Sequence, residues 1–438
     1  MRNTARSLKA WRGISPDLQR SLFGSVYTND VVGPALKPAP ERSCEKVHGR
    51  GAPDRSPKHC LGPLLQHIGC IRVPGQDNLN VLPCDPEHLF VIGCPCGFRP
   101  LDVEGGKIYD SSPQVYPLPS DKAALIGNPA YDLLRKQGYG MVGRHSAVKL
   151  CHWLRKSLRG KGHCYKQEFY GIQSHRCLQM SPSVAHCDFR CIYCWRPVEF
   201  TQGVEMGEEI DGPEEIVSGS IASQRKLLSG YGGVPDLVPN GRFKEALEPK
   251  HAAISLAGEP TLYPRLGELI HEYSKRGMTT FLVTNGSFPA ALENLTTEPT
   301  QLYISLSAPS EALHLSVNRP IVKGSWKSIM ESLDLIGSFG CRTVVRLTLA
   351  RGLNMVEAGS YAELVGRSSP DFVEVKAYMF VGWSRHRLTI GNMPSFVEIR
   401  RFADSLQAAS GYQKECESAS SRVVLLARDP GSRMIRAA

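Results

Sequence analysis

Apolar and polar positions follow two different periods along this chain, and the regular pattern begins near Asn128. Short runs that are apolar throughout indicate buried strands, and longer segments with an apolar residue every three or four positions indicate helices that pack on one face. The strands predicted in this way are 177–181, 252–258, 279–286, 302–308, 342–350 and 371–380; the helices are 214–231, 264–277, 325–340 and 361–369.

The order of these elements predicts an α/β fold. Strands that are apolar throughout and joined by helices are typical of a parallel sheet covered by helices. Six such units form a partial (β/α)6, TIM-like barrel, in which chemistry occurs at the C-terminal ends of the strands. The motifs AGEPT, TNG and SAPS each stand where a predicted strand ends.

Residues 1–130 differ from the rest of the chain. Sixteen of the 31 prolines precede Tyr131, and apolar periodicity there is short and interrupted. We therefore expect a low-complexity, Pro-rich and disordered N-terminal extension. One alternative is a small metal-binding appendage built on its scattered cysteines, and another is a natural start at Met141. The ordered domain is expected over 131–410, and 411–438 is either a tail or a final element.

The segment 145–162 reads as a helix. Ser146 is its expected N-cap, and Gly160 lies near its C-terminal stop.

Composition and charge narrow the class of protein. Hydrophobic residues make up 42% and charged residues 21%, which is ordinary for a globular protein. The net charge of +10 favours an anionic partner, with nucleic acid first and a membrane surface second, although a mildly basic enzyme would carry it too. We find no apolar run of about 18 residues and no signal-peptide core, so we expect a cytoplasmic protein without a membrane span.

Six of the 14 cysteines lie between residues 151 and 195. Cys151, Cys164 and Cys177 are separated by twelve residues each, and C-x3-C-x2-C follows at Cys187, Cys191 and Cys194. In a reducing compartment, clustered thiols indicate metal ligands, and thiolates suit zinc or iron–sulfur clusters. Three cysteines leave one iron of a cubane open. Half of a structural zinc site is the alternative, but no second C-x2-C pair follows.

The C-x3-C-x2-C motif, with Tyr193 before its last cysteine, resembles the signature of the radical S-adenosylmethionine superfamily. The resemblance implies that Cys187, Cys191 and Cys194 hold a [4Fe–4S] cluster whose open iron binds S-adenosylmethionine, and that one electron yields a 5′-deoxyadenosyl radical. Gly258, Glu259 and Pro260 resemble the superfamily's cofactor-contacting element. Asn285 and Ser305, or Ser307, are further cofactor candidates at strand ends, unless they only cap the following helices.

Residues from about 128 to 400 resemble the archaeal-type S-adenosylmethionine-dependent tRNA 4-demethylwyosine synthases. The motifs are the C-x12-C-x12-C array, LAGEPTLYPRL, LVTNG, LYISLSAPS and VKAYMFVGWSRHRL. The resemblance implies a second [4Fe–4S] cluster on Cys151, Cys164 and Cys177, and a Schiff base between Lys166 and pyruvate. A solvated surface lysine is the plain alternative for Lys166, and pyruvate bound to the second cluster is another route.

The same resemblance implies the reaction and its partners. A radical carbon–carbon lyase would join N1-methylguanosine-37 of tRNA(Phe) to two carbons of pyruvate and form the tricyclic 4-demethylwyosine. The flavodoxin-like domain of the eukaryotic enzymes is not evident, so a separate flavodoxin or ferredoxin would supply electrons to a monomer. Rival readings are another radical enzyme that modifies RNA and a non-catalytic RNA-binding protein with structural zinc.

Two segments could meet the RNA, in particular the anticodon loop. Residues 149–167 carry six cations and no carboxylate, a run that suits phosphates or simply a helix C-terminus. Residues 376–388 interleave aromatic and cationic side chains, which suits an unstacked base, although their apolar half reads equally well as a core strand.

Overall fold

The structure is a computed structural model that describes residues 91–94, 97–104, 107–110, 129–234, 238 and 241–435. The chain divides into two compact units, 1–111 and 112–438. In the first unit, β1 (Val91–Cys94), β2 (Gly97–Glu104) and β3 (Lys107–Asp110) form an antiparallel sheet. These strands lie inside the extension that the sequence predicts to be disordered. The other expectations for this extension, including metal binding by its cysteines, fall outside the described residues.

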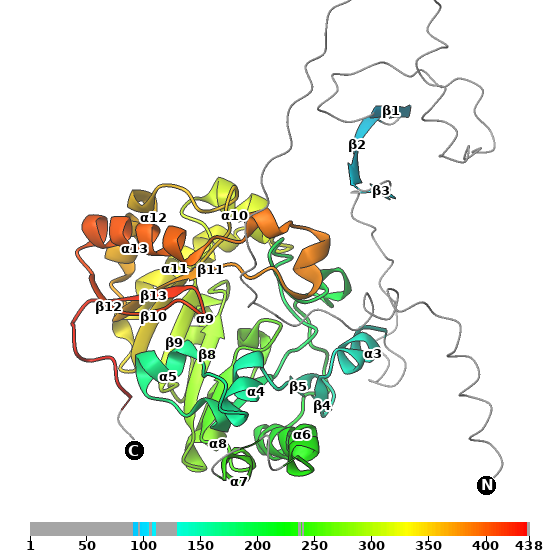
Figure 1. Cartoon of the computed structure of the whole chain (residues 1–438), viewed down its shortest axis with the longest axis vertical. Coiled ribbons are helices and arrows are strands. Elements are labelled where there is room, and N and C mark those ends of the chain that lie inside the picture. The colour runs from blue at the N-terminus through cyan, green and yellow to red at the C-terminus, as the bar shows by residue number, and fades with distance from the viewer. Residues whose placement is uncertain are drawn as a thin grey trace, which may run out of the picture. The chain divides into compact units, whose positions relative to one another are not determined.

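The second unit is built on one ten-stranded sheet (Figure 1). Its six central strands are parallel and adjacent in chain order, which confirms the predicted α/β fold with a partial barrel. They are β6 (Cys177–Ser181), β7 (His251–Ile254), β8 (Thr279–Thr284), β9 (Gln301–Ser305), β10 (Arg342–Leu349) and β11 (Phe372–Ala377).

Both faces of the central strands are buried, which explains their continuous apolar runs. On β8 and β9, Leu282 and Ile304 pack into the larger core, while Phe281 and Tyr303 face a second, aromatic cluster. Helix α5 (Tyr165–Tyr170) contributes Tyr165, Phe169 and Tyr170 to that second cluster. One face of the sheet is therefore lined by aromatic side chains and covered by a short helix.

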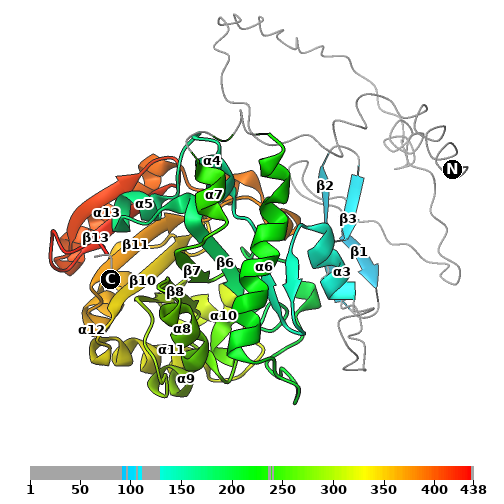
Figure 2. The same ribbon diagram turned by 90° about the horizontal axis from the view of Figure 1, so that it is seen from below.

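Helices cover the other face of the sheet (Figures 1 and 2). The predicted helices are confirmed, with small shifts at their ends, as α6, α8, α11 and α12. The helices that follow β6 in the chain are α6 (Pro213–Gly232), α7 (Arg242–Ala246), α8 (Leu266–Lys275), α9 (Pro289–Glu293), α10 (Glu311–Asn318), α11 (Ser325–Asp334), α12 (Ala358–Ser368) and α13 (Phe396–Ser410). Of these, α7 packs against α6 and the earlier helix α4 (His152–Leu158) and not on the sheet. Helix α3 (Pro129–Lys136) precedes the sheet.

The predicted helix over 145–162 is wrong in its first half. Residues Ser146–Val148 form strand β5, which pairs with β4 (Gly140–Val142) and with β6. Ala147 and Val148 are fully buried there, and this packing outweighs local helix propensity. Helix α4 spans His152–Leu158, with Cys151 rather than Ser146 as its N-cap. Gly160 follows two residues later with φ of 68°, as expected for a helix stop.

The C-terminal residues extend the sheet. Strands β12 (Gln413–Ser418) and β13 (Val423–Ala427) are antiparallel, and β13 pairs with β11. All five residues of β13 are buried. The sequence left a tail or a final element open for 411–438, and the structure places two strands there.

Candidate active site

The C-x3-C-x2-C cysteines lie on a loop beyond the C-terminal end of β6. Cys187 is buried, while Cys191 and Cys194 are partly buried. Burial raises the pKa of the Cys191 thiol well above its usual value, and the neighbouring Cys194 and Cys187 raise it further. One short loop carries all three thiols, and each negative thiolate would disfavour ionisation of the next.

Arg196 places a buried positive charge beside these thiols. Its side chain donates a hydrogen bond to the Phe189 carbonyl oxygen at 3.2 Å. Burial alone would lower the pKa of Arg196, but Cys187 and Cys194 outweigh burial and raise it. A cation in this position stabilises thiolates, which are the form of cysteine that binds metals.

The motif Gly258-Glu259-Pro260 packs directly against the same loop. Gly258 has φ of 72°, and a Cβ atom there would collide with the backbone carbonyl oxygens of Ser183 and His186. The Glu259 N–H donates to the His186 oxygen at 2.8 Å. Only glycine therefore allows the end of β7 to approach the residue just before Cys187 so closely.

The Glu259 carboxylate is buried and accepts hydrogen bonds from three residues. Oε1 accepts hydrogen bonds from the Thr261 N–H (3.1 Å), the Thr261 hydroxyl (2.6 Å) and the Thr284 hydroxyl (2.6 Å). Oε2 accepts the N–H of Asn285 at 2.8 Å. Burial raises the pKa of Glu259 to about 7 although these donors oppose the shift. The carboxylate thus joins the motif to the end of β8.

Asn285 connects this carboxylate to the cysteine loop. Its side-chain N–H donates to Asp188 Oδ1 at 2.7 Å, and its Oδ1 accepts from Ser287. Sequence reasoning missed Asp188, whose side chain is fully buried. Its second oxygen, Oδ2, has no hydrogen-bond partner within the part of the chain that the structure describes. The acidic residue within the C-x3-C-x2-C motif was the sequence signal that could have identified Asp188.

Tyr193 extends from the loop to the end of β9. Its hydroxyl donates to Ser307 Oγ at 2.5 Å and lies 3.1 Å from Asn318 Oδ1. Ser307, the alternative to Ser305, is therefore the serine that contacts the motif. Ser305 is the last residue of β9, partly buried, and pairs in register with Arg346 of β10.

The second cysteine triplet also comes together. Cys151 and Cys164 are the N-caps of α4 and α5, and Cys177 is the first residue of β6. Burial raises the pKa of the Cys177 thiol, and Cys151 and Cys164 raise it further. The cysteines of this triplet therefore lie at the N-termini of two helices and one strand, and not on a single loop.

Both triplets offer three thiols, which are the donors that iron–sulfur clusters use. Each triplet also has a buried cation that influences its thiols, Arg196 or Lys166. Among the described residues, no group of His, Cys, Asp and Glu side chains is arranged to hold a single metal ion. In a cubane each cysteine binds a different iron, so its sulfurs need not converge on one point.

Lys166 is buried on the aromatic face of the sheet. Its Nζ lies 4.2 Å from the ring centroid of Phe281 and 4.3 Å from that of Tyr303. Burial lowers the pKa of Lys166 to about 8, and Arg346 lowers it further, while Glu374 and the adjacent thiols oppose the shift. The alternative interpretation of Lys166 as a solvated surface lysine is therefore wrong, and a larger fraction of the amine is neutral than in water.

A buried carboxylate lies in the same region and was missed from the sequence. Glu374 accepts hydrogen bonds from Tyr165 (2.9 Å), Tyr170 (2.8 Å) and Arg346 (2.8 Å). Burial would raise the pKa of Glu374, but Arg346 and Lys166 outweigh burial and lower it. Glu374 and Arg346 interrupt otherwise apolar strands, and that interruption was the signal for an internal site.

The structure leaves fewer side chains of the segment 376–388 available for contact with RNA. Lys376 is internal and donates to the Ser421 carbonyl oxygen at 3.0 Å, and Tyr378 is buried with its hydroxyl on Ser384. Arg387 contacts the cysteine loop instead of solvent. Arg385 is exposed, and Trp383 is partly so.

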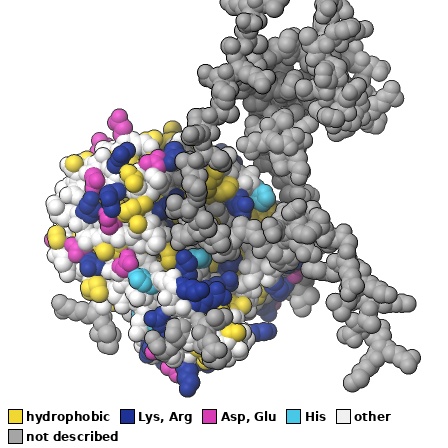
Figure 3. Space-filling view, viewed as in Figure 1, with side chains coloured by type: hydrophobic (Ala, Val, Ile, Leu, Met, Phe, Trp, Pro, Cys, Tyr) yellow, Lys and Arg dark blue, Asp and Glu magenta, His cyan; other side chains and the backbone are white. Residues whose placement is uncertain are grey.

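The cationic run 149–167 likewise contains both internal and exposed side chains. Lys166 is buried, and Lys149 lies over the rings of Tyr139 (4.4 Å) and Trp195 (5.1 Å). Arg155, Arg159 and Lys161 are exposed. Figure 3 shows a gathering of Lys and Arg side chains over the position of α4.

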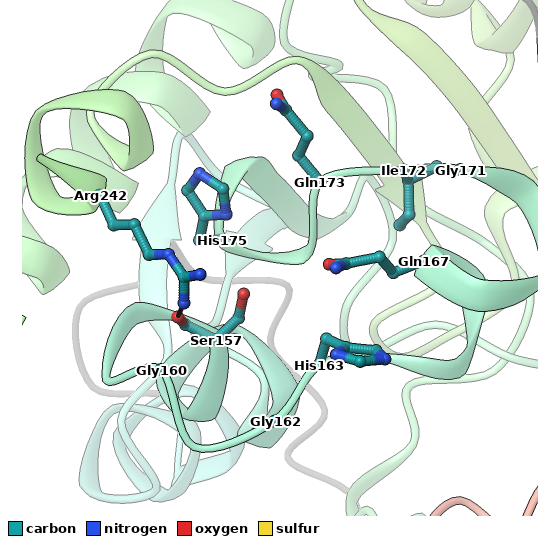
Figure 4. Close-up of a pocket in the computed structure, with 10 residues that line it drawn as sticks. All are labelled: Ser157, Gly160, Gly162, His163, Gln167, Gly171, Ile172, Gln173, His175 and Arg242. Atoms are coloured by element: carbon teal, nitrogen blue, oxygen red, sulfur yellow. Dashed lines mark hydrogen bonds between the residues drawn. The ribbon is translucent and has the colours of Figure 1, made fainter. Parts of the chain in front are cut away.

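A pocket of about 320 Å³ opens beside the second triplet (Figure 4). His175 on one wall pairs with Glu245 at 2.5 Å, and Arg242 donates to the Ser157 carbonyl oxygen at 2.7 Å. Gln167 and Gln173 also line it. The pocket is polar, and none of the predicted site residues lines it.

Comparisons with known proteins define the class. Residues 182–365 match the model of the radical SAM superfamily, and residues 367–428 match that of wyosine base formation. The cysteine loop and the Gly258–Pro260 motif both lie within the first match. The chain is therefore a radical S-adenosylmethionine enzyme, a class that uses S-adenosylmethionine and a [4Fe–4S] cluster.

Curated relatives define the family. An S-adenosyl-L-methionine-dependent tRNA 4-demethylwyosine synthase of Pyrococcus abyssi is 55% identical over 302 residues, which are 68% of this chain and 88% of the relative. The synthase of Methanocaldococcus jannaschii is 43% identical over 309 residues, 69% of this chain and 96% of the relative. The chain belongs to the tRNA 4-demethylwyosine synthase family.

A solved structure described as TYW1 with a lysine-pyruvate adduct bound agrees with this assignment. It is 41% identical and has a TM-score of 0.64 over 71% of this chain and 98% of that chain. A crystal structure of archaeal TYW1 is 38% identical, with a TM-score of 0.59 over 71% of this chain and 100% of that chain.

Among the described helices, none combines the length and the apolar character that a membrane span requires.

The close approach at Gly258 leads to a test with a matched control. We expect Gly258→Ala to lower the free energy of unfolding by about 2–5 kcal/mol, because left-handed strain (about 1–2 kcal/mol) adds to the clash with two carbonyl groups. Gly277 also has positive φ, 66°, but open space around it, so Gly277→Ala carries only the strain. Denaturant unfolding of both variants measures the difference, and equal losses would contradict the packing argument.

Proposed function

We propose that this enzyme joins N1-methylguanosine-37 of tRNA(Phe) to two carbons of pyruvate, forming 4-demethylwyosine as a carbon–carbon lyase. The observation that carries the proposal is the burial of the Lys166 amine against Phe281 and Tyr303, next to Cys164 and Cys177. The lysine-pyruvate adduct named for the similar TYW1 structure supports it.

Lys166 is proposed as the group that binds pyruvate. A neutral amine attacks the keto carbon, and loss of water leaves a Schiff base. Burial favours the neutral amine, and the aromatic walls formed by Phe281 and Tyr303 exclude water from the carbon–nitrogen bond. Cys151, Cys164 and Cys177 would hold a second [4Fe–4S] cluster, whose open iron could bind the pyruvate carboxylate as well; the two modes are compatible.

The radical is proposed to form at the other triplet. A [4Fe–4S] cluster bound by Cys187, Cys191 and Cys194 would supply the electron that cleaves S-adenosylmethionine. Arg196 offsets the negative charge of the thiolates. Asp188 Oδ2 and Glu259 offer carboxylate oxygens next to the loop for the amino group of the cofactor, and Tyr193, Gly258, Pro260, Asn285 and Ser305 complete the proposed set.

The exposed cations are proposed to meet the anticodon stem and loop of the RNA. Arg155, Arg159 and Lys161 form part of the surface in Figure 3 and suit phosphate contacts. Trp383 and Arg385 are the remaining candidates in 376–388 for a base that leaves its stack. An external flavodoxin or ferredoxin, a monomeric state and a cytoplasmic location stay predictions.

Product formation tests the proposal directly. Anaerobically reconstituted enzyme is incubated with reductant, S-adenosylmethionine, pyruvate and tRNA(Phe) that carries N1-methylguanosine-37. We expect the tricyclic nucleoside after digestion, detected by mass spectrometry, and its loss when pyruvate is omitted. Formation of 5′-deoxyadenosine without any tricyclic nucleoside would reject the proposed substrates and keep the radical class.

Replacing the amine tests Lys166. We expect Lys166→Ala to reduce product formation at least ~100-fold, because a covalent attachment point is lost. Borohydride should trap pyruvate on the wild-type chain and not on this variant, as peptide mass mapping would reveal. Lys275→Ala, at an exposed lysine of α8, is the matched control and should behave as wild type. Unchanged turnover in Lys166→Ala would move pyruvate binding to the cluster.

Iron content tests the two-cluster proposal. Two cubanes hold about eight irons and eight sulfides per chain. Replacing Cys151, Cys164 and Cys177 together by Ala should leave about four irons and preserve cleavage of S-adenosylmethionine. Replacing Cys187, Cys191 and Cys194 should also leave about four but abolish cleavage. A wild-type content of about four irons would contradict the second cluster.

A further inference from the structure

The segment that follows β11 packs on the C-x3-C-x2-C loop. The backbone N–H of Trp383 donates a hydrogen bond to the backbone carbonyl oxygen of Trp195 at 2.9 Å. Gly382 has φ of 63°, and a Cβ atom there would collide with the same oxygen. The rings of Trp383 and Phe200 meet edge to face at 6.0 Å. Part of the region matched to wyosine base formation therefore rests on the loop that carries the radical-forming cysteines.

Arg387 makes four hydrogen bonds from the segment after β11 to the cysteine loop and the residues that follow it. Its Nε donates to the Ile192 carbonyl oxygen at 3.1 Å, and its Nη2 donates to the carbonyl oxygens of Cys194 and, at 3.3 Å, Arg196. Its Nη1 forms an ion pair with Glu199 at 2.6 Å. The side chain is only 12% exposed.

These contacts complement those on the other side of the loop. The N–H groups of Arg190 and Ile192 donate to the carbonyl oxygens of Asn318 and Val317, both at 3.0 Å, at the C-terminal end of α10. The loop is neither helix nor strand between Cys187 and Cys194, so its polar backbone groups need partners from elsewhere. Helix α10 accepts from its N–H groups, and Arg387 donates to its carbonyl groups.

We propose that Arg387 is a positioning residue of the radical-forming site, which holds the backbone of Cys194 and its neighbours so that the three thiolates face one cluster. The planar guanidinium has five donors in a fixed geometry, which suits several carbonyl oxygens at once, whereas a lysine ammonium is a compact point charge. Arg387 acts through the backbone of the loop. The proposal rests on the radical S-adenosylmethionine class of the enzyme and is independent of the RNA substrate and of pyruvate.

The test compares Arg387→Lys with Arg400→Lys. Arg400 also makes a two-pronged contact, with Glu417, but lies exposed on α13. Three quantities are measured without tRNA or pyruvate: iron content, the change in the electron paramagnetic resonance spectrum of the reduced protein on addition of S-adenosylmethionine, and the rate of 5′-deoxyadenosine formation. Only a cluster that binds the cofactor contributes to the spectral change, so this readout is specific to the loop.

We expect Arg387→Lys to alter the cofactor-induced spectral change and to slow 5′-deoxyadenosine formation about tenfold or more, since small misplacements of reacting groups have large effects. Arg400→Lys should match wild type in all three quantities. Arg387→Gln, which keeps one amide donor, is a second variant in case Arg387→Lys does not fold. A folded variant at 387 with the wild-type spectrum and rate would overturn the proposal.

Glu199→Gln separates the ion pair from the carbonyl contacts. This change removes the charge that Arg387 faces and leaves the three carbonyl oxygens in place. If Arg387 acts by holding the loop backbone, Glu199→Gln should keep the wild-type spectral change and a cleavage rate within about twofold of wild type. An effect of Glu199→Gln as large as that of Arg387→Lys would assign the role to the ion pair and overturn positioning through the backbone. Because no RNA is present, failure of the proposed tRNA reaction would not produce either result.

Discussion

A single buried carboxylate, that of Glu259, joins the parts of the candidate site. An ionised carboxylate away from water is costly unless donors surround it, and Glu259 accepts from the Thr261 N–H and hydroxyl, the Thr284 hydroxyl and the Asn285 N–H. Its own N–H donates to the His186 carbonyl oxygen. The ends of β7 and β8 are thereby tied to the segment before Cys187, and the position of the cysteine loop depends on that tie.

A second buried carboxylate organises the interior of the partial barrel. Glu374 on β11 draws in Arg346 from the neighbouring strand and two tyrosines from α5. Because α5 is preceded by its N-cap Cys164 and carries Lys166, the contacts that hold this helix against the sheet also place the amine. Removing one partner of such a buried pair would leave an uncompensated charge, so the site and the stability of the domain rest on the same contacts.

The sequence predicted much of the fold because burial on both faces leaves a clear record. All six central strands and four of the outer helices could be read from apolar runs and helical periodicity. The failures lie where tertiary contacts overrule local pattern. Ser146 looks like a helix cap but belongs to a strand that pairs with β6. Helix α13 and the strand pair β12 and β13 were not predicted. Lys376 and Arg387 look like surface cations but serve internal carbonyl oxygens.

The sequence by itself determined the ligand types and their spacing, since cysteine chemistry and the C-x3-C-x2-C and C-x12-C-x12-C intervals are readable without a fold. The predicted partial (β/α)6 barrel also implied that the six central strands lie in chain order, as they do. Only the tertiary structure decided which polar residues are internal. Burial depends on what packs against a residue from distant parts of the chain, as Arg387 on the cysteine loop demonstrates. For Glu374, the interruption of an apolar strand indicated an internal residue, but no local pattern indicated its partners on α5.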